Sequence, residues 1–509
     1  MDFRKRFICV ILLISILIFV AFLNSGCNND TANTGNNQSS LDSDGSGSGE
    51  TDKIDGITEE TMIYTPDLPE MDFGGYEFKV YQRGPEVTEW NEVCIYAEAE
   101  NGELINDAVY RRNRIIEGKY NIEIVPINGT GGIYDDGIKK GFENSVLAGD
   151  NAFDMAMSGV YDSSLHARRG MLVDFYDMPY IDPEQPWWDI AVNDSLTIMN
   201  RLYFGMSKMG VNCKDDSFCI LFNKELAQEI GIENPYQLVQ ENKWTFDKMI
   251  ELGKLAVMDL DGDGAMGKDD RYGYSGFDAE AWNLYVASGE QIARTDDKGI
   301  PYFTMLSDRG VQVLEKIYTI FKEDDLMINT SGLPGMELHE QTHRLLDNKQ
   351  VLFAGSAMIV VQMARAMEKD FGMLPYPKFD ANQDKYYTIC GLWGPTAVTV
   401  PVTNTELNRT GIIIEALVAE SMNTVFPAYY DLNLVIKGLR DEDSKEMLDI
   451  IMAGRRYDIG MLYNWGGVRD IILNTINSAR TTLVTAYERV EARAAAALEQ
   501  TMEEFSKIQ

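Results

Sequence analysis

Alternating strand-like and helix-like segments near the start of the chain constrain its fold most strongly. Apolar residues such as Ile105, Val109 and Ile116 recur there at helical spacing, and shorter apolar runs have strand character. The succession is strand 76–81, helix 103–120, strand 121–125, helix 137–148 and strand 153–157. This β-α-β-α-β order predicts an α/β fold with a mostly parallel sheet covered by helices. Clefts of such sheets lie beyond the carboxyl ends of the strands, where 159–164 follows the third strand.

Size and charge narrow the class of protein. The segment 62–509 is too long for one typical domain and indicates two or three. A hydrophobic content of 45% is ample for large cores, and we found no second apolar run of membrane-spanning length after the N-terminus. The net charge of −35, from 80 acidic and 45 basic residues, repels phosphate backbones and argues against a nucleic-acid ligand.

Cysteine is sparse in residues 62–509, which we call the body of the chain. Cys94, Cys213, Cys219 and Cys390 are too few for a disulfide framework, although one or two pairings are open. Stability is therefore expected to come mainly from packing.

The N-terminal 27 residues have the layout of a secretory signal. Basic residues at 4–6 precede an almost purely apolar run at 8–23, and small residues lead to Cys27. The segment resembles a bacterial lipoprotein signal, except that Asn24 stands where that family prefers Leu. The resemblance implies that Cys27 receives acyl chains such as palmitate and becomes the mature N-terminus, on the outer face of the cytoplasmic membrane. An uncleaved anchor helix is the alternative.

The polar segment 28–61 has almost nothing to bury and is expected to be a disordered linker. A flexible chain of that length spans about 30 Å on average. It would hold the body near the membrane and leave it free to reorient.

Five motifs in a fixed order give the body a family resemblance. They are 73–76 (FGGY), 102–113 (GELINDAVYRRN), 221–226 (LFNKEL), 242–247 (NKWTFD) and 353–358 (FAGSAM). Together they resemble the extracellular solute-binding proteins that feed ABC importers, in a carbohydrate-type branch. The resemblance implies two α/β lobes that close on a ligand in the cleft between them, a monomer, and permease subunits as partners. We assign the first lobe to 62–205 plus 395–430 and the second to 206–394 plus 431–509, with the C-terminal helices mainly on the second.

An acidic loop between a predicted helix and a strand has the spacing of a calcium-binding loop. Asp259, Asp261 and Asp263 alternate, Gly264 takes the sixth position, and Asp270 stands at the twelfth in place of the usual Glu. The backbone of Ala265 would supply a further oxygen. We predict a structural Ca²⁺ here, with an ordinary acidic turn as the alternative.

Aromatic residues are the best sequence guide to the ligand. Rings stack on the apolar faces of sugars, and carboxylates accept hydrogen bonds from hydroxyl groups, so a cleft containing both suits a carbohydrate. Tyr161 and Asp162 match the family's ligand loop after the third strand. The candidate ligand-binding residues are Trp90, Tyr161, Asp162, Trp188, Trp282, Trp393 and Trp465, and a packed core position is the alternative for each.

A competing motif, H-E-x-x-H, spans His339, Glu340 and His343. On a helix it would bind zinc with Glu340 as general base, as in metallopeptidases. Glu368 is the conceivable third ligand, and polar-face residues of an amphipathic helix are the simpler interpretation.

The sequence therefore predicts a non-enzymatic, lipid-anchored receptor that binds an oligosaccharide for an ABC importer. A surface zinc peptidase and a lipoprotein that binds a peptide or polymer without transport are the rival hypotheses.

Overall fold

The computed structural model describes residues 63–508 except 133–135, 323–324, 334–337, 364–368, 435–441 and 479–481. The predicted signal, Cys27 and the linker to residue 61 lie outside the described residues, as does Glu368.

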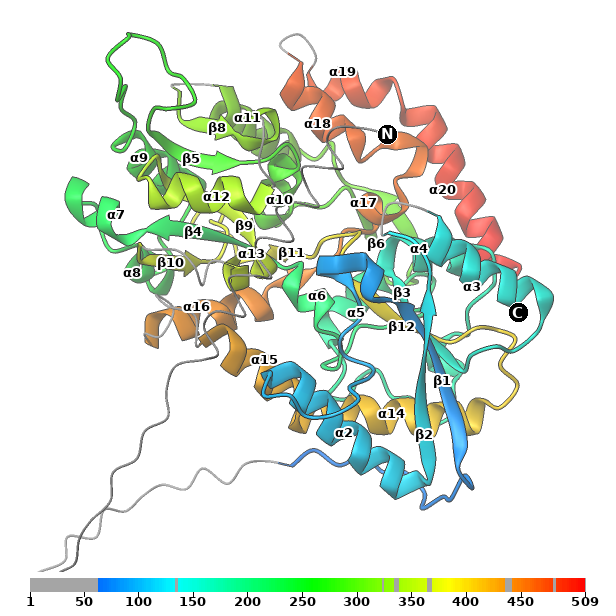
Figure 1. The fold of residues 1–509 in the computed structure, drawn as a ribbon. Coiled ribbons are helices and arrows are strands. Elements are labelled where there is room, and N and C mark those ends of the chain that lie inside the picture. The colour runs from blue at the N-terminus through cyan, green and yellow to red at the C-terminus, as the bar shows by residue number, and fades with distance from the viewer. Residues whose placement is uncertain are drawn as a thin grey trace, which may run out of the picture. The chain divides into compact units, whose positions relative to one another are not determined.

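A four-stranded sheet, here called the first sheet, contains the predicted β-α-β-α-β unit (Figure 1). Its order is β12-β3-β1-β2, from β1 (Tyr76–Arg83), β2 (Ile122–Gly129), β3 (Met155–Gly159) and β12 (Thr396–Thr399). β1 pairs in parallel with both β2 and β3, and β12 adds antiparallel to β3 with Val398 opposite Met157. The helices of the unit are α2 (Leu104–Tyr120) and α3 (Gly137–Ala148), which confirms the local prediction. The expected loop after β3 is instead the start of α4 (Val160–Arg168).

The second sheet has five strands in the order β10-β4-β9-β5-β8. They are β4 (Phe218–Asn223), β5 (Tyr272–Gly276), β8 (Met327–Asn329), β9 (Val351–Ala357) and β10 (Phe371–Leu374). β9 is antiparallel to β4 and parallel to β5, so this sheet is mixed. All seven residues of β9 are buried, which explains its unbroken run of small and apolar side chains.

Helix capping explains the polar residue at the centre of two of the five motifs, 221–226 and 242–247. Asn223 ends β4 and accepts a hydrogen bond from the Leu226 amide, which starts α7 (Lys224–Ile230). Thr245 caps α9 (Phe246–Lys254) in the same way by accepting from Lys248. Other helices near this sheet are α8 (Pro235–Gln240), α10 (Glu280–Ala287), α11 (Asp308–Lys322), α12 (Leu338–Asp347), α13 (Met358–Met363) and α16 (Glu442–Ala453).

Two short strands lie where the chain passes between the sheets. β11 (Thr388–Ile389) pairs in parallel with β13 (Arg455–Arg456), and Ser217 bridges to Cys390. Further elements are η1 (Pro85–Trp90), η2 (Phe175–Asp177), α5 (Ile190–Leu196), α6 (Asn212–Asp215), β6 (Ala293–Thr295), β7 (Pro301–Phe303), η3 (Thr330–Gly332), α17 (Ile459–Tyr463), η5 (Trp465–Gly467), α18 (Asp470–Asn477) and α19 (Leu483–Glu488).

The C-terminal helices divide between the two sheets. α16 packs near β10 and α18 near α10, whereas α20 (Glu491–Ser506) packs on η5 and on α4. Arg168 of α4 forms an ion pair with Glu504 at 2.8 Å. The lobe boundaries themselves stay predictions.

One helical stretch of the described residues, Leu407–Leu432, is long and apolar enough to cross a membrane by length and composition. The prediction of no further apolar run of this length is therefore wrong. The stretch covers α14 (Leu407–Asn423) and most of α15 (Val425–Leu434), and 67% of its most apolar window is buried inside the protein. Both helices pack against α2, which makes this stretch part of the core.

Candidate ligand-binding site

A cavity of about 550 Å³ opens between the first and second sheets. Its walls come from η1, from the start of α10, from β9 and α13, and from the chain that follows β11. The lining includes Glu86, Trp90, Asp216, Phe218, Phe277, Trp282, Asn283, Ser356 and Trp393. We call this cavity the cleft.

Three of the predicted tryptophans meet in the cleft. Trp90, Trp282 and Trp393 all line it and are half-buried. The rings of Trp282 and Trp393 lie 6.4 Å apart with an interplanar angle of 34°. Two partly exposed rings at this angle offer a curved aromatic surface to a ligand.

Arginine contacts hold this aromatic surface in place. The Arg469 guanidinium carbon lies 5.5 Å from the Trp282 ring centre and 5.2 Å from that of Trp393. Trp282 donates its indole hydrogen to the Arg469 carbonyl at 3.2 Å. From the other sheet, Arg83 at the end of β1 donates to the carbonyls of Trp393 and Gly394. Arg469 therefore orients both indoles, and Arg83 fixes the backbone that carries Trp393.

A buried carboxylate forms the floor beside Trp90. Asp216 is 8% exposed, and burial raises its pKa to about 7, although the Gly394 amide and Arg83 act in the opposite direction. A Cβ atom at Gly394 would lie 2.6 Å from the Trp90 ring and 2.7 Å from the Asp216 carboxylate. Only glycine leaves both groups in place at this point.

Tyr161 and Asp162 border the cleft without lining it. The Tyr161 ring is 6.3 Å from Trp393, and its amide donates to the Leu392 carbonyl at 3.3 Å. Asp162 lies near Arg83 across Gly159, and burial raises the pKa of Asp162. Both support the cleft wall from the first turn of α4.

Trp188 and Trp465 lie in the core, which corrects their assignment as ligand-binding residues. Each is 1% exposed. Trp188 donates to Glu415 at 3.0 Å, and Trp465 donates to Thr501 of α20 at 2.9 Å and stacks on Tyr463. Their indole hydrogens are satisfied inside the protein, so neither ring is available to a ligand in this structure.

Several cleft residues were missed in the sequence. Asp216 carried a usable signal, because Asp215 and Asp216 are adjacent carboxylates directly before an apolar strand. Phe218, Asn283 and Ser356 had none, since their place in the lining depends on how the two sheets face each other.

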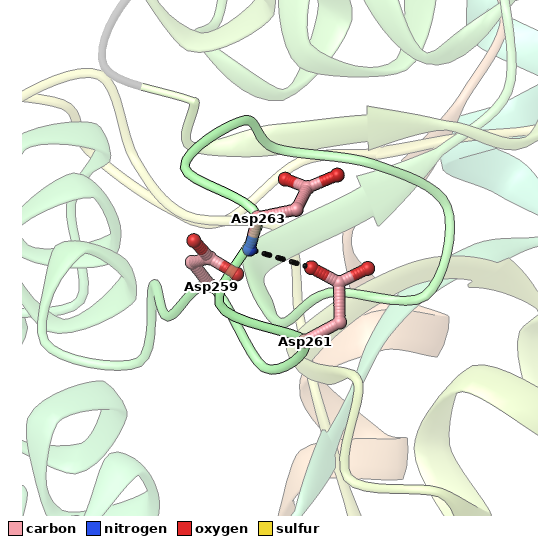
Figure 2. A group of neighbouring side chains, drawn as sticks. All are labelled: Asp259, Asp261 and Asp263. Atoms are coloured by element: carbon pink, nitrogen blue, oxygen red, sulfur yellow. Dashed lines mark hydrogen bonds between the residues drawn. The ribbon is translucent and has the colours of Figure 1, made fainter.

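The acidic loop lies outside the cleft lining, and its carboxylates converge in part (Figure 2). Asp259, Asp261 and Asp263 are exposed, and one oxygen from each lies within 4.8 Å of the others. Gly264 has φ of +85°, as expected for the sixth position, and its amide donates to Asp259. Asp270 is not in this group, because its oxygens accept from the Leu260 and Gly267 amides, which lower its pKa. The amide of Ala265 donates to Asp263 at 2.8 Å.

The H-E-x-x-H segment lies on α12, as expected. Nε2 of His343 is 2.9 Å from the Val360 carbonyl oxygen. Among the described residues, the acidic loop is the group of side chains arranged to hold a metal ion, and it includes neither Glu340 nor His343.

The four cysteines of the body, Cys94, Cys213, Cys219 and Cys390, are buried as free thiols. This settles the pairings that the sequence left open.

Comparison with solved structures identifies the fold. The sugar-binding protein MalE from Xanthomonas citri matches with a TM-score of 0.56 at 12% identity, over 85% of this chain and 99% of that one. The ABC substrate-binding protein Lmo0181 from Listeria monocytogenes, in complex with cycloalternan, matches with a TM-score of 0.51 at 13% identity, over 84% of this chain and 99% of that one. The apo form of RafE from Streptococcus pneumoniae matches with a TM-score of 0.51 at 14% identity, over 86% of this chain and 98% of that one.

No protein-family model matches the chain, and no curated protein matches it by sequence. At these identities the similarity is one of fold. The chain has the two-lobe α/β fold of periplasmic binding proteins, which confirms the predicted fold class.

Proposed function

We propose that this protein is a receptor that binds an oligosaccharide outside the cytoplasmic membrane and delivers it to an ABC importer. The observation that supports this most is the cleft, where Trp90, Trp282 and Trp393 face a cavity that also contains Asp216 and Glu86. Stacking surfaces beside hydrogen-bond acceptors suit the alternating CH faces and hydroxyl groups of a sugar.

The solved structures of this fold support the same ligand class. Two of the similar proteins are a sugar-binding protein and a substrate-binding protein in complex with cycloalternan. A cavity of about 550 Å³ has the size of small-molecule sites and has room for more than one sugar ring. The proposed mechanism is capture by lobe closure, in which the closed, ligand-bound state is presented to the permease and no bond is made or broken.

Direct binding tests this proposal. The protein is titrated with linear and cyclic gluco-oligosaccharides by isothermal titration calorimetry, with monosaccharides and short peptides as comparison ligands. We expect saturable binding of at least one oligosaccharide and a higher melting temperature in its presence. Binding of peptides without any carbohydrate would instead favour a peptide-binding lipoprotein.

The anchor is a separate part of the proposal and rests on Cys27. Cys27→Ser is expected to release the protein from membranes or to leave the precursor unprocessed. Detergent-phase partitioning and the size of the mature protein measure this. Unchanged partitioning and processing would contradict lipidation and leave the sugar-binding proposal untouched.

A further inference from the structure

A second cavity, of about 330 Å³, lies beside the β11–β13 pair and shares no lining residue with the cleft. Four of its lining side chains are cationic: Arg294, Lys385, Arg455 and Arg456. Asp194 at its edge is the one acidic residue of the lining. In a chain with 80 acidic and 45 basic residues, such a lining reverses the average charge of the protein. We call this cavity the basic pocket.

Arg455 is the cation whose charge the protein itself neutralises. It is 4% exposed and forms an ion pair with the buried Asp189. It also donates to the Cys213 carbonyl at 3.2 Å. This pair anchors the floor of the pocket.

Arg456 is held in a different way. It donates to the carbonyls of Val286 at 2.8 Å and Glu290 at 3.0 Å, and its guanidinium carbon lies 3.8 Å from the Tyr387 ring centre. Carbonyl groups and a ring orient a guanidinium but leave its net charge in place. Burial lowers the pKa of Arg456 to about 10, so it remains charged at neutral pH.

Two more cations complete the pocket at its mouth. Arg294 and Lys385 are exposed; Arg294 donates to the Gly289 carbonyl at 3.0 Å, and Lys385 lies 5.2 Å from the Tyr387 ring centre. Within the described part of the chain, neither of them nor Arg456 forms an ion pair with a carboxylate. The lining therefore carries four cationic side chains and one carboxylate, Asp194, although Asp458 and Glu290 lie close enough to Arg456 to oppose the lowering of its pKa.

We propose that the basic pocket binds a small multivalent oxyanion, either a phosphoryl compound or a polycarboxylate. The guanidinium group of Arg294 supplies a planar pair of N–H donors, which matches the oxygens of both anion types. Arg456 adds its positive charge, while its Nη2 group stays bound to the two carbonyls. Lys385 adds a point charge at the mouth. The bound anion balances the excess of positive charge in the lining of the pocket.

Calorimetry with two probes tests this site on the full-length protein. Inorganic phosphate and citrate are titrated separately, with sodium chloride holding the ionic strength constant. We expect saturable, single-site binding of at least one probe. Binding of phosphate alone assigns the phosphoryl class, and binding of citrate alone assigns the carboxylate class. If neither probe binds saturably, the proposal is wrong.

The double variant R294Q/K385Q removes the two exposed cations. This variant is expected to bind the probe with an affinity lower by about tenfold or more, because two charge-assisted contacts are lost. The matched control K119Q/K243Q makes the same change in net charge at two exposed lysines elsewhere. It should bind as the wild type does. Equal affinity in both double variants would overturn the assignment, and the single variant K385Q provides the same comparison if R294Q/K385Q misfolds.

Discussion

Trp393 and Trp465 are the same residue type in opposite roles. Trp393 is half-buried at the cleft, where Arg469 packs on its ring and Arg83 donates to its backbone carbonyl. Trp465 is buried under α20 and donates a hydrogen bond to Thr501 of that helix. The first indole is free to meet a ligand, and the second stabilises the fold.

Alanine substitutions are expected to separate these roles. Trp393→Ala and Trp282→Ala should each weaken oligosaccharide binding by about 1–3 kcal/mol, or tenfold to a hundredfold, because stacking area is lost. Their melting temperatures without ligand should change little. Trp465→Ala should instead destabilise the fold by about 3–5 kcal/mol, because it removes a buried ring. Calorimetry and chemical unfolding measure the two effects, and a destabilised Trp393→Ala with normal binding would contradict the cleft assignment.

The sequence could identify aromatic residues but could not place them. Trp465 stands in a glycine-containing turn that looks exposed, and the helix that covers it begins at Glu491. Asp216 reaches the cleft only because the chain crosses between the sheets at that point. Such placement depends on contacts between distant segments, which local patterns do not record.

Among the secondary-structure elements, local signals were sufficient for the first sheet. Predicted and observed bounds agree to within a few residues for β1, α2, β2, α3 and β3, because each has a clear period and sharp ends. The order β10-β4-β9-β5-β8 of the second sheet was not predicted. Its strands come from segments up to about 150 residues apart, and their pairing is set by the tertiary structure.

The acidic loop is the element on which calcium should act. If Asp259, Asp261 and Asp263 hold Ca²⁺, chelation is expected to lower the melting temperature, because an ion bound to the folded state stabilises it. Asp261→Ala should remove that sensitivity. Asp269→Ala, an exposed neighbour outside the group, is the matched control. A melting temperature that changes neither with chelator nor with added calcium would count against the site.

In the whole molecule, buried carboxyl groups should make stability depend on pH. Burial raises the pKa of several of them to about 6 or 7: Asp215, Asp216, Glu280, Glu415 and Asp458. The folded state therefore binds more protons than the unfolded state between about pH 4 and 7, and stability falls as pH rises through that window. His166 acts in the opposite direction, since burial lowers its pKa to about 3 and favours folding at higher pH.

Five carboxyl groups outweigh one histidine, and the repulsion of a net charge of −35 acts in the same direction as the carboxyl groups. We expect a melting temperature that is higher near pH 5 than near pH 8, at constant ionic strength. Glu415→Gln should reduce this difference, because it removes one of the five groups and keeps the shape of the side chain. An equal or lower melting temperature at pH 5 would show that the raised pKa values do not govern stability.

The distribution of tryptophans gives the protein an optical property of its own. Three of the seven border the cleft, and the other four, Trp187, Trp188, Trp244 and Trp465, are at most 5% exposed. Indole emission responds to nearby water, so a ligand that displaces water from the cleft changes the fluorescence of the first group and leaves the second as a constant background. The unmodified chain can therefore report its own occupancy, without an attached dye, as a shift in emission wavelength.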